Sequence, residues 1–396
     1  MTKKSDAPAI RFKGFSDAWE QRKVQGVADR LDNLRIPVAA NLRVHGTTPY
    51  YGANGIQDYV EGFTHDGEFV LVAEDGANDL KNYPVKCVNG RIWVNNHAHV
   101  LQGKAGIADN SFLAFAISQS DIESLLVGGG RAKLNAETLM SIEFRLPCLQ
   151  EQYRIGEYLT QLNHLITLHQ RKFEKLTNVK KSMLEKMFPQ NGSSYPEIRF
   201  KGFTDPWEQR KLGDIGKARS GVGFPDADQG GLTGVPFFKV SDMNSDGNEN
   251  EMTVANNYVT AEQIADHRWS PITELPAIFF AKVGAAVMLN RKRLCRFPFL
   301  LDNNTMAYSL SPTKWDADFA KALFGTVDLT SLVQVGALPS YNAGDVESME
   351  IYLPSLLEQE QIGAYFKHLD HLITLHQREL EKLQNIKKSM LEKMFV

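Results

Sequence analysis

The most regular pattern of hydrophobic and polar positions lies in residues 155–187, which contain no proline and a single glycine, Gly156. Apolar positions there alternate at spacings of three and four residues, as in the a/d seam of a coiled-coil helix. At 1.5 Å per residue this segment predicts a helix roughly 50 Å long. Its seam positions are Leu159, Leu162, Ile166, His169, Phe173 and Leu176.

The same pattern returns near the end of the chain. The second seam consists of Phe366, Leu369, Ile373, His376, Leu380 and Leu383. Two matched seams can bury each other as an antiparallel coiled coil, whereas helices packed singly on their own domains usually carry a wider apolar stripe. The equivalent seam histidines, His169 and His376, are more typical of polar residues that fix register than of metal ligands, and we assign no metal.

The remaining segments alternate short apolar runs, such as 69–72 and 91–94, with turns rich in Gly, Asn and Asp. This alternation is typical of strands joined by loops. The predicted fold class is α/β (mixed α+β), with two globular domains separated by two long antiparallel coiled-coil helices and an internal pseudo-two-fold repeat.

The repeat is visible in the letters of the sequence. Residues 10–23 read IRFKGFSDAWEQRK and residues 198–211 read IRFKGFTDPWEQRK, an offset of 188. Residues 146–188 match residues 353–395 at an offset of 207. A frame of two motifs has therefore been duplicated.

The two inserts held by this frame hardly resemble each other except at their exit, where residues 133–147 align with 340–354. One architecture with two different inserts indicates a molecule that recognises two different things. The predicted domains are residues 1–145 (first insert with its opening motif), 146–188 (central helix), 189–197 (linker), 198–352 (second insert with its opening motif) and 353–396 (carboxyl-terminal helix).

Composition places the chain among ordinary globular proteins. Its 396 residues have room for two or three domains, and 43% are hydrophobic while 23% are charged. We find no apolar run of about 18 residues and no signal-peptide pattern. The three cysteines are widely spaced and form no CxxC motif, which argues against disulfides and zinc and favours a cytoplasmic location.

The net charge of −3 is unevenly distributed. Residues 24–145 carry −4 (10 basic and 14 acidic residues), residues 212–352 carry −6 (11 and 17), and the repeated frame carries +7 (23 and 16). The inserts are not general polycations. Any affinity for nucleic acid must come from local basic clusters or from partner subunits.

Tyrosines, asparagines and basic residues on predicted loops are suited to stacking on bases or to hydrogen bonding with base edges. For any one of them a plain role in a turn is the alternative, because Asn-Gly and Asp-Gly pairs form turns by themselves. His97 and His99 could suggest a metal, but no third ligand has a recognisable spacing. The DNA-binding candidates in the first insert are Tyr50, Tyr51, Asn54, Asn95, Asn96, Arg131 and Lys133.

In the second insert, apolar runs are followed by polar residues, which predicts polar side chains at strand ends. Lysines and arginines there could serve phosphates or guanine. The glycines of residues 221–231 form neither a dinucleotide-binding nor a P-loop motif, so we exclude nucleotide binding. The candidates are Lys239, Ser241, Asn244, Lys282, Arg291, Lys292, Arg293, Asn303 and Tyr341.

Sequence motifs of catalysis are missing. The chain has no Walker A sequence, no Asn/Asp-Pro-Pro-Phe/Tyr tetrapeptide of amino-methyltransferases, no Gly-x-Ser-x-Gly and no His-Glu-x-x-His. We therefore expect a protein that recognises rather than reacts: not an enzyme, with no catalytic residues and no cofactor of its own.

In its order of motifs the chain resembles the specificity subunit of type I DNA restriction–modification systems. The likeness rests on the RF-x-G-F-x-D-x-W-E motifs (11–20 and 199–208), the L-P-x-L-x-E-Q motifs (146–152 and 353–359) and the two inserts. YYGANGI and NNHAHVL look like one kind of target-recognition domain, while PFFKVSDMN and DNNTM look like another.

This resemblance implies that each insert reads one half of a bipartite, asymmetric site in double-stranded DNA. The helices would fix the gap between the halves and dock two modification subunits, which bind S-adenosylmethionine and methylate adenine N6. Two restriction subunits would add ATP- and Mg-dependent translocation and cleavage. A stand-alone DNA-binding regulator and a coiled-coil scaffold are the alternatives.

Overall fold

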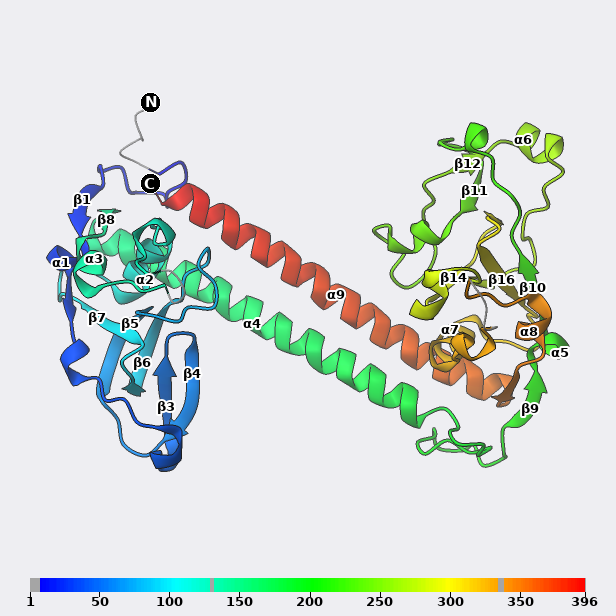
Figure 1. Ribbon diagram of the computed structural model, residues 1–396, viewed down its shortest axis with the longest axis horizontal. Helices are drawn as coiled ribbons and strands as arrows, with labels where there is room; N and C mark the ends of the chain where they lie inside the picture. Colours follow the sequence, from blue (N-terminus) through cyan, green and yellow to red (C-terminus); the bar gives the residue numbers. More distant parts are fainter. Residues whose placement is uncertain (1–7, 129–131, 334–337, 396) are drawn as a thin grey trace. The chain divides into compact units, whose positions relative to one another are not determined.

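The polypeptide folds into two units, and each unit contains one half of each long helix. The computed structural model describes residues 8–128, 132–333 and 338–395 (Figure 1). Unit 1 comprises Met1–Gln170 and Arg378–Val396, and unit 2 comprises Arg171–Gln377. The domain boundaries given above, which set the helices apart as domains of their own, stay predictions.

The two long helices are α4 (Leu149–Lys186) and α9 (Leu356–Met394), of 38 and 39 residues. Both predicted helices are thus confirmed, and each begins ten residues before its first seam residue, Leu159 or Phe366. The seam positions are buried or half-buried while the residues between them are mostly exposed. In unit 1 the first turns of α4 pack with the last turns of α9, and in unit 2 the last turns of α4 pack with the first turns of α9. The two helices are therefore antiparallel.

The rest of unit 1 is built on a six-stranded sheet in the order β2-β7-β5-β6-β3-β4, in which only β3 and β6 pair in parallel. Strand β5 contributes the buried run Phe69–Ala73, as expected of a central strand. The elements of unit 1 are β1 (Glu20–Lys23), α1 (Val24–Val27), β2 (Ala28–Arg30), η1 (Asp32–Leu34), η2 (Ala40–Leu42), β3 (His45–Gly52), β4 (Gly55–Val60), β5 (His65–Ala73), β6 (Val85–Val94), β7 (Ala98–Gly103), α2 (Asn110–Ser118), η3 (Glu123–Leu125), α3 (Ala136–Ser141) and β8 (Glu143–Leu146).

Unit 2 has a four-stranded sheet, β10-β16-β13-β14, and a three-stranded sheet, β12-β11-β15. Every residue of β13 is buried. The elements are β9 (Glu208–Lys211), α5 (Leu212–Ile215), β10 (Gly216–Ser220), η4 (Asp226–Asp228), β11 (Val235–Phe238), η5 (Val240–Asn244), β12 (Tyr258–Val259), α6 (Ala261–Asp266), β13 (Ala277–Ala281), η6 (Ala285–Leu289), β14 (Lys292–Cys295), β15 (Leu300–Leu301), β16 (Thr305–Leu310), α7 (Ala317–Thr326), η7 (Leu329–Leu332), α8 (Ala343–Glu347) and β17 (Glu350–Leu353).

The repeated motifs form the same joint twice, where the insert meets its helix. Arg11 binds Glu151 through two hydrogen bonds of 2.8 and 2.7 Å. Arg199 binds Glu358 in the same way, with two bonds of 2.7 Å. Both carboxylates are almost fully buried. Next to the joint, β1 pairs with β8 and β9 pairs with β17, so that each insert begins and ends at one place.

The glutamine of each L-P-x-L-x-E-Q motif fastens the helix to the insert. Gln152 accepts a hydrogen bond from Asp109 N (3.0 Å) and donates to the carbonyl of Pro147 (2.9 Å). Gln359 repeats both contacts with Asp316 N and the carbonyl of Pro354. This explains why the motif recurs.

A close approach of two helices explains the glycine one turn further on. A Cβ atom at Gly156 would lie 2.7 Å from Asp109 Oδ1, and one at Gly363 would lie 2.2 Å from Asp316 Oδ1. Asp109 and Asp316 are the N-caps of α2 and α7, where they accept from the backbone N–H groups of residues 112 and 319. Any side chain at either glycine would push α2 or α7 away from the long helix.

The expectation that the two inserts resemble each other only at their exit is wrong. Asp109/Asp316 and Phe112/Phe319 are also related by the offset of 207, and they have the same contacts in both units. The structural equivalence thus extends back through α2 and α7. Sequence comparison misses it because few residues in these stretches are identical.

The carboxyl-terminal tip of each helix completes the core of a unit. Phe188, just after α4, packs against Trp207, Phe319 and Phe366 in unit 2. Phe395, just after α9, packs against Trp19 and Phe112 in unit 1. Among the described residues, no helix is both long and apolar enough to span a bilayer.

Removing the carboxylate of the first joint, the Arg11–Glu151 pair, tests how much this pair contributes to the stability of unit 1. We expect Glu151→Ala to lower the free energy of unfolding of unit 1 by about 3 kcal/mol, because Arg11 would be left largely buried without its partner. The measurement is urea denaturation of the full chain followed by circular dichroism.

Glu20→Ala is the matched control. Glu20 pairs with Arg22 at 2.6 Å, but both side chains are more than half exposed, so the loss should stay below about 1 kcal/mol. Equal losses for the two variants would contradict the role given to the buried joint.

Candidate nucleic-acid interface

Four segments of unit 1 meet at one edge of its sheet. They are the β3–β4 turn with Asn54, the segment after β5, the β6–β7 turn with Asn96, and the end of the first insert with Lys133. We call this last segment, which lies at the start of residues 133–147, the exit segment. Asn54 Nδ2 donates to the carbonyl of Gly76 (2.8 Å), and Leu134 N donates to the carbonyl of Glu74 (2.7 Å). Segments distant in sequence therefore present their polar side chains together.

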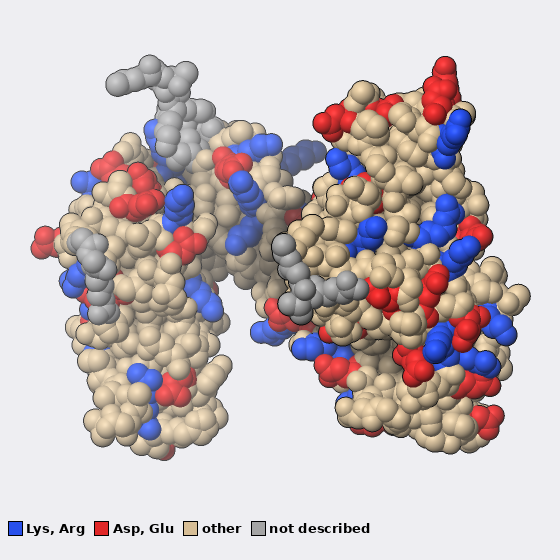
Figure 2. All heavy atoms as spheres, turned by 45° about the vertical axis from the view of Figure 1, so that its right-hand side comes forward, with Lys and Arg blue, Asp and Glu red and all other residues tan. Residues whose placement is uncertain are grey.

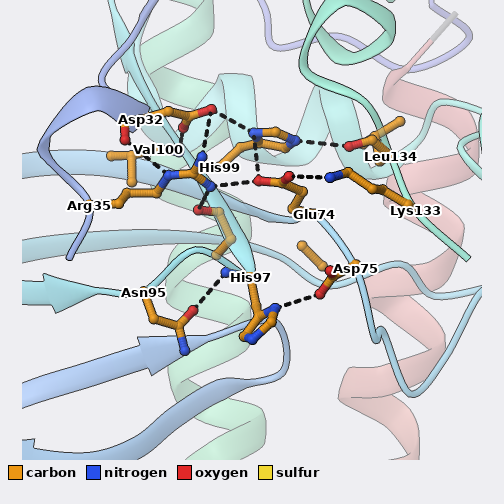
Figure 3. A network of polar contacts seen from close by, with 12 residues as sticks. Asp32, Arg35, Glu74, Asp75, Asn95, His97, His99, Val100, Lys133 and Leu134 are labelled. Carbon is orange, nitrogen blue, oxygen red and sulfur yellow. Dashed lines mark hydrogen bonds and ion pairs between the residues drawn. The ribbon is translucent and has the colours of Figure 1, made fainter. Parts of the chain in front are cut away.

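A buried histidine organises the interior side of this edge (Figure 3). His99 is 1% exposed, and its Nδ1 lies 2.7 Å from Asp32 Oδ2 while its Nε2 lies 2.9 Å from the carbonyl oxygen of Leu134. Both ring nitrogens thus lie within hydrogen-bonding distance of an oxygen atom, and His99 ties η1 to the exit segment.

Two carboxylates, one arginine and one lysine complete the network. Glu74 binds Arg35 Nη1 at 2.7 Å and Lys133 Nζ at 2.8 Å. Asp32 accepts from Val100 N (2.8 Å) and lies 3.5 Å from Arg35. The network leaves Lys133, a predicted DNA-binding residue, engaged with a carboxylate, although its side chain is 44% exposed.

Opposing effects act on the pKa values of these carboxyl groups. Burial alone raises the pKa of Asp32, but the hydrogen bonds from His99 and Val100 outweigh it, and the pKa lies below its usual value. Burial likewise raises the pKa of Glu74, and the bonds from Lys133 and Arg35 bring it below the usual value. Both groups are therefore ionised at neutral pH.

Asp32, Glu74 and His99 could also be viewed as metal ligands, since one atom of each lies within 4.8 Å of the others. Their atoms are already bound to Arg35, Lys133 and the carbonyl of Leu134. We therefore interpret the cluster as an ion-pair network that shapes the edge. It was not recognised from the sequence, because its members come from four distant segments.

Not every candidate of the first insert is accessible. Tyr50 is buried and its hydroxyl bonds the backbone of Val38, Tyr51 is buried next to Lys86, and Asn95 is buried with its side chain bonded to His97 N. These three build the edge in this structure. Asn54 and Asn96 are exposed on it, and Arg131 lies outside the described residues.

The corresponding edge of unit 2 collects polar residues at strand ends, as the sequence predicted. Lys239 follows β11, Lys282 follows β13, and Asn303 lies in the turn between β15 and β16. Asp302 N donates to the carbonyl of Phe238 (3.0 Å), and Lys282 N donates to the carbonyl of Asn304 (2.9 Å). These bonds bring the three strand ends together.

Next to them, Ser241 and Asn244 are exposed, and Asn244 accepts a hydrogen bond from Arg291. Figure 2 shows basic and acidic side chains interspersed over the visible surface, in keeping with the slightly acidic inserts.

Three candidates of the second insert are occupied within the domain. Lys292 Nζ donates to the carbonyl of Val327 (2.5 Å), and burial lowers its pKa to about 8. Arg293 donates to the carbonyl of Asn248 (2.6 Å), and burial lowers its pKa as well. The hydroxyl of Tyr341 donates to the carbonyl of Ala281 (2.6 Å), and burial raises its pKa. To contact DNA, each would have to give up an internal bond.

Acid should weaken the network of unit 1. Because the folded-state pKa values of Asp32 and Glu74 lie below their usual values near 4, their contribution to stability is complete above about pH 5 and is lost as the pH falls through the folded values. We expect the loss of stability between pH 6 and pH 3 to be smaller for Asp32→Asn than for the wild type.

Urea denaturation across this pH range measures the difference. Asp66→Asn serves as the control, since Asp66 lies in a largely exposed pair with Arg91. Parallel pH profiles for the wild type and Asp32→Asn would refute the role of the carboxylate.

Comparison with known proteins agrees with this arrangement. A type I restriction modification DNA specificity domain matches residues 16–178 and again residues 204–385. A crystal structure of the S subunit of a type I restriction–modification system from M. genitalium has a TM-score of 0.69 at 15% identity and covers 98% of this chain and 99% of that chain, so the fold is shared.

Relatives are also found by sequence. The putative type I restriction enzyme specificity subunit S.HindORF215P of Haemophilus influenzae is 44% identical over 146 residues, which is 37% of this chain but only 38% of that protein. The MjaVIII specificity subunit of Methanocaldococcus jannaschii is 23% identical over 318 residues, 74% of this chain and 70% of that protein. Since the domain matches cover most of the sequence in two consecutive copies, the chain belongs to the family of type I restriction–modification DNA specificity subunits.

Proposed function

We propose that each unit reads one half of a bipartite, asymmetric DNA site. It does so with the sheet edge described above, at which its turns and strand ends meet and which we call the loop edge. The observation that carries this proposal is that the two edges have the same construction and different chemistry. Leu134 N donates to the carbonyl of Glu74 in unit 1, and Tyr341 N, 207 positions later, donates to the carbonyl of Lys282 in unit 2. Glu74 at one edge thus corresponds to Lys282 at the other. Edges of the same construction with different side chains at equivalent places suit different base sequences.

The helices are proposed to fix the gap between the two half-sites. An α-helix of 38 residues is about 57 Å long, and α4 begins in the core of unit 1 and ends at the core of unit 2. A continuous helix without an internal proline resists bending, which makes it suitable as a spacer.

The helices also offer one surface twice. A shallow groove on α4 is lined by Arg171, Glu174, Lys175, Asn178, Val179, Ser182 and Met183. The groove on α9 is lined by the residues 207 positions later, and only Val179 differs, being replaced by Ile386. Two equal surfaces in the repeated part of the helices favour two copies of one partner, which we take to be the modification subunit.

The partner subunits would supply the chemistry. In this proposal the two modification subunits bind S-adenosylmethionine and methylate adenine N6, and two restriction subunits use ATP and Mg for translocation and cleavage. The present chain supplies base recognition and spacing. Its slightly acidic inserts suit a complex in which partners provide part of the phosphate contact.

Methylation mapping tests the proposal. The chain is co-expressed with its cognate modification subunit in a methylation-free host, and N6-methyladenine is mapped across the genome. We expect one split motif, methylated on both strands and absent without this chain.

Absence of new methylation, with a soluble complex verified, would favour one of the alternatives. Tight DNA binding by the chain alone would then identify a stand-alone regulator. A chain that binds no DNA would be a coiled-coil scaffold.

Charge reversal tests the docking grooves. We expect Arg171→Glu or Arg378→Glu to remove one modification subunit from the complex and the double variant to remove both, with binding at least about tenfold weaker at each altered groove. Native mass spectrometry of the purified complex counts the subunits.

Arg154→Glu is the control, because Arg154 is exposed on α4 outside the groove and its counterpart in α9 is Gln361. A double variant that is natively folded by circular dichroism and still holds both partners would exclude these grooves as the docking sites.

A further inference from the structure

Two exposed asparagines occupy the same place in the two units. Asn96 lies in the turn between β6 and β7, and Asn303 lies in the turn between β15 and β16. They are 207 positions apart, the offset that also relates the helices and the N-cap residues Asp109 and Asp316. The two turns are therefore equivalent parts of the duplicated structure.

The residue before each asparagine holds the turn in place. Asn95 Oδ1 accepts from His97 N (2.8 Å), and Asp302 Oδ1 accepts from Asn304 N (3.2 Å). Both side chains are buried, with 4% and 5% exposed. The backbone of the turn is anchored alike as well, since Asn95 N donates to Tyr51 O (3.1 Å) and Asp302 N donates to Phe238 O (3.0 Å). The turn that carries each asparagine is thus fixed by equivalent hydrogen bonds in the two units.

The local structure does not explain why both exposed residues are asparagine. Asparagine is common in turns because it tolerates a positive φ, but the described non-glycine residues with positive φ are Asn191, Arg268 and Asn290. Within the described part of the chain, the amide of neither Asn96 nor Asn303 forms a hydrogen bond or an ion pair. The backbone would accept other residues at both positions.

The surrounding sequence has diverged, which makes the shared asparagine informative. Between residues 95–119 and 302–326, three of 25 aligned pairs are identical: Asn96/Asn303, Asp109/Asp316 and Phe112/Phe319. The aspartates cap helices and the phenylalanines are buried in the two cores. The asparagine pair is the one identity among the three without a role in folding.

From these observations we infer that Asn96 and Asn303 make the same contact in both half-sites, a bidentate pair of hydrogen bonds to adenine. An amide offers one acceptor and one donor side by side, which matches N6–H and N7 of adenine in the major groove. A phosphate contact needs only a donor, which Ser, Lys or Arg would supply as well. The two half-sites would therefore share an adenine at corresponding positions, while the different neighbours of each asparagine, such as Glu74 and Lys282, set the other bases.

This inference rests on the proposed function and is tested in the same complex. The full chain and its cognate modification subunit are prepared with Asn96→Ala or Asn303→Ala, the methylated motif is mapped, and binding is measured on duplexes altered at each motif position. We expect each variant to lose its preference for adenine at one position of one half-site, by roughly five- to 150-fold, and to keep the other half-site unchanged.

Replacement by aspartate gives a second, nearly isosteric readout. A carboxylate only accepts hydrogen bonds, so Asn96→Asp and Asn303→Asp should shift the preference at the same position from adenine toward cytosine, whose N4 donates. Asn89→Ala is the matched control, because Asn89 is exposed on β6 away from the turn and should leave the motif unchanged.

The outcomes separate the two proposals. If the wild-type complex methylates a split motif and the alanine and aspartate variants keep it unchanged, the adenine contact is refuted while the proposed function stands. A uniform loss of affinity for all sequences would also overturn it, in favour of a phosphate contact. A wild-type complex that methylates nothing would refute the proposed function itself.

Discussion

The buried pair of Arg11 and Glu151, and its counterpart of Arg199 and Glu358, is the constraint on which the rest of the structure depends. The partners are 140 and 159 residues apart in sequence, and the two glutamates are almost fully buried. A buried carboxylate is tolerated only with a well-placed cation, so the arginine must return to the start of the helix. Each pair therefore closes an insert into a loop whose two ends are fixed at one joint.

A closed joint leaves the interior of each insert free to diverge. The first insert builds one six-stranded sheet, whereas the second divides its strands between a four-stranded and a three-stranded sheet. At the position of His99, which centres the ion-pair network of unit 1, unit 2 has the fully buried Met306. The same frame thus supports a buried histidine within an ion-pair network at one loop edge and a buried methionine at the equivalent position of the other.

Holding the side chains of the unit 1 network in place costs free energy, because two carboxylates are largely buried there. Burial disfavours the charges of Asp32 and Glu74, and several hydrogen bonds from cationic partners and backbone groups offset this. In return the exit segment is fixed against the sheet. Base recognition depends on such fixed geometry, because a side chain that must first be ordered loses part of its binding free energy.

The sequence by itself determined the helices and the frame. A seven-residue hydrophobic repeat is a local property, since the residues that form a seam lie within a few turns of one another. The repeated motifs likewise identified the joints, because the same residues recur there at fixed offsets. The strand-end positions of Lys239, Lys282 and Asn303 were also predictable, since apolar runs followed by polar residues mark the ends of buried strands.

Only the tertiary structure decided which candidates are accessible and which distant residues meet. Tyr50, Asn95, Lys292 and Tyr341 are of the right chemical type for DNA contact, but their side chains are bonded inside the domain, and residue type alone does not reveal burial. The equivalence of Asn96 and Asn303 was hidden among diverged neighbours. It emerged from the hydrogen bonds that anchor the two turns, because contacts between strands far apart in sequence are set by the fold and not by the local pattern.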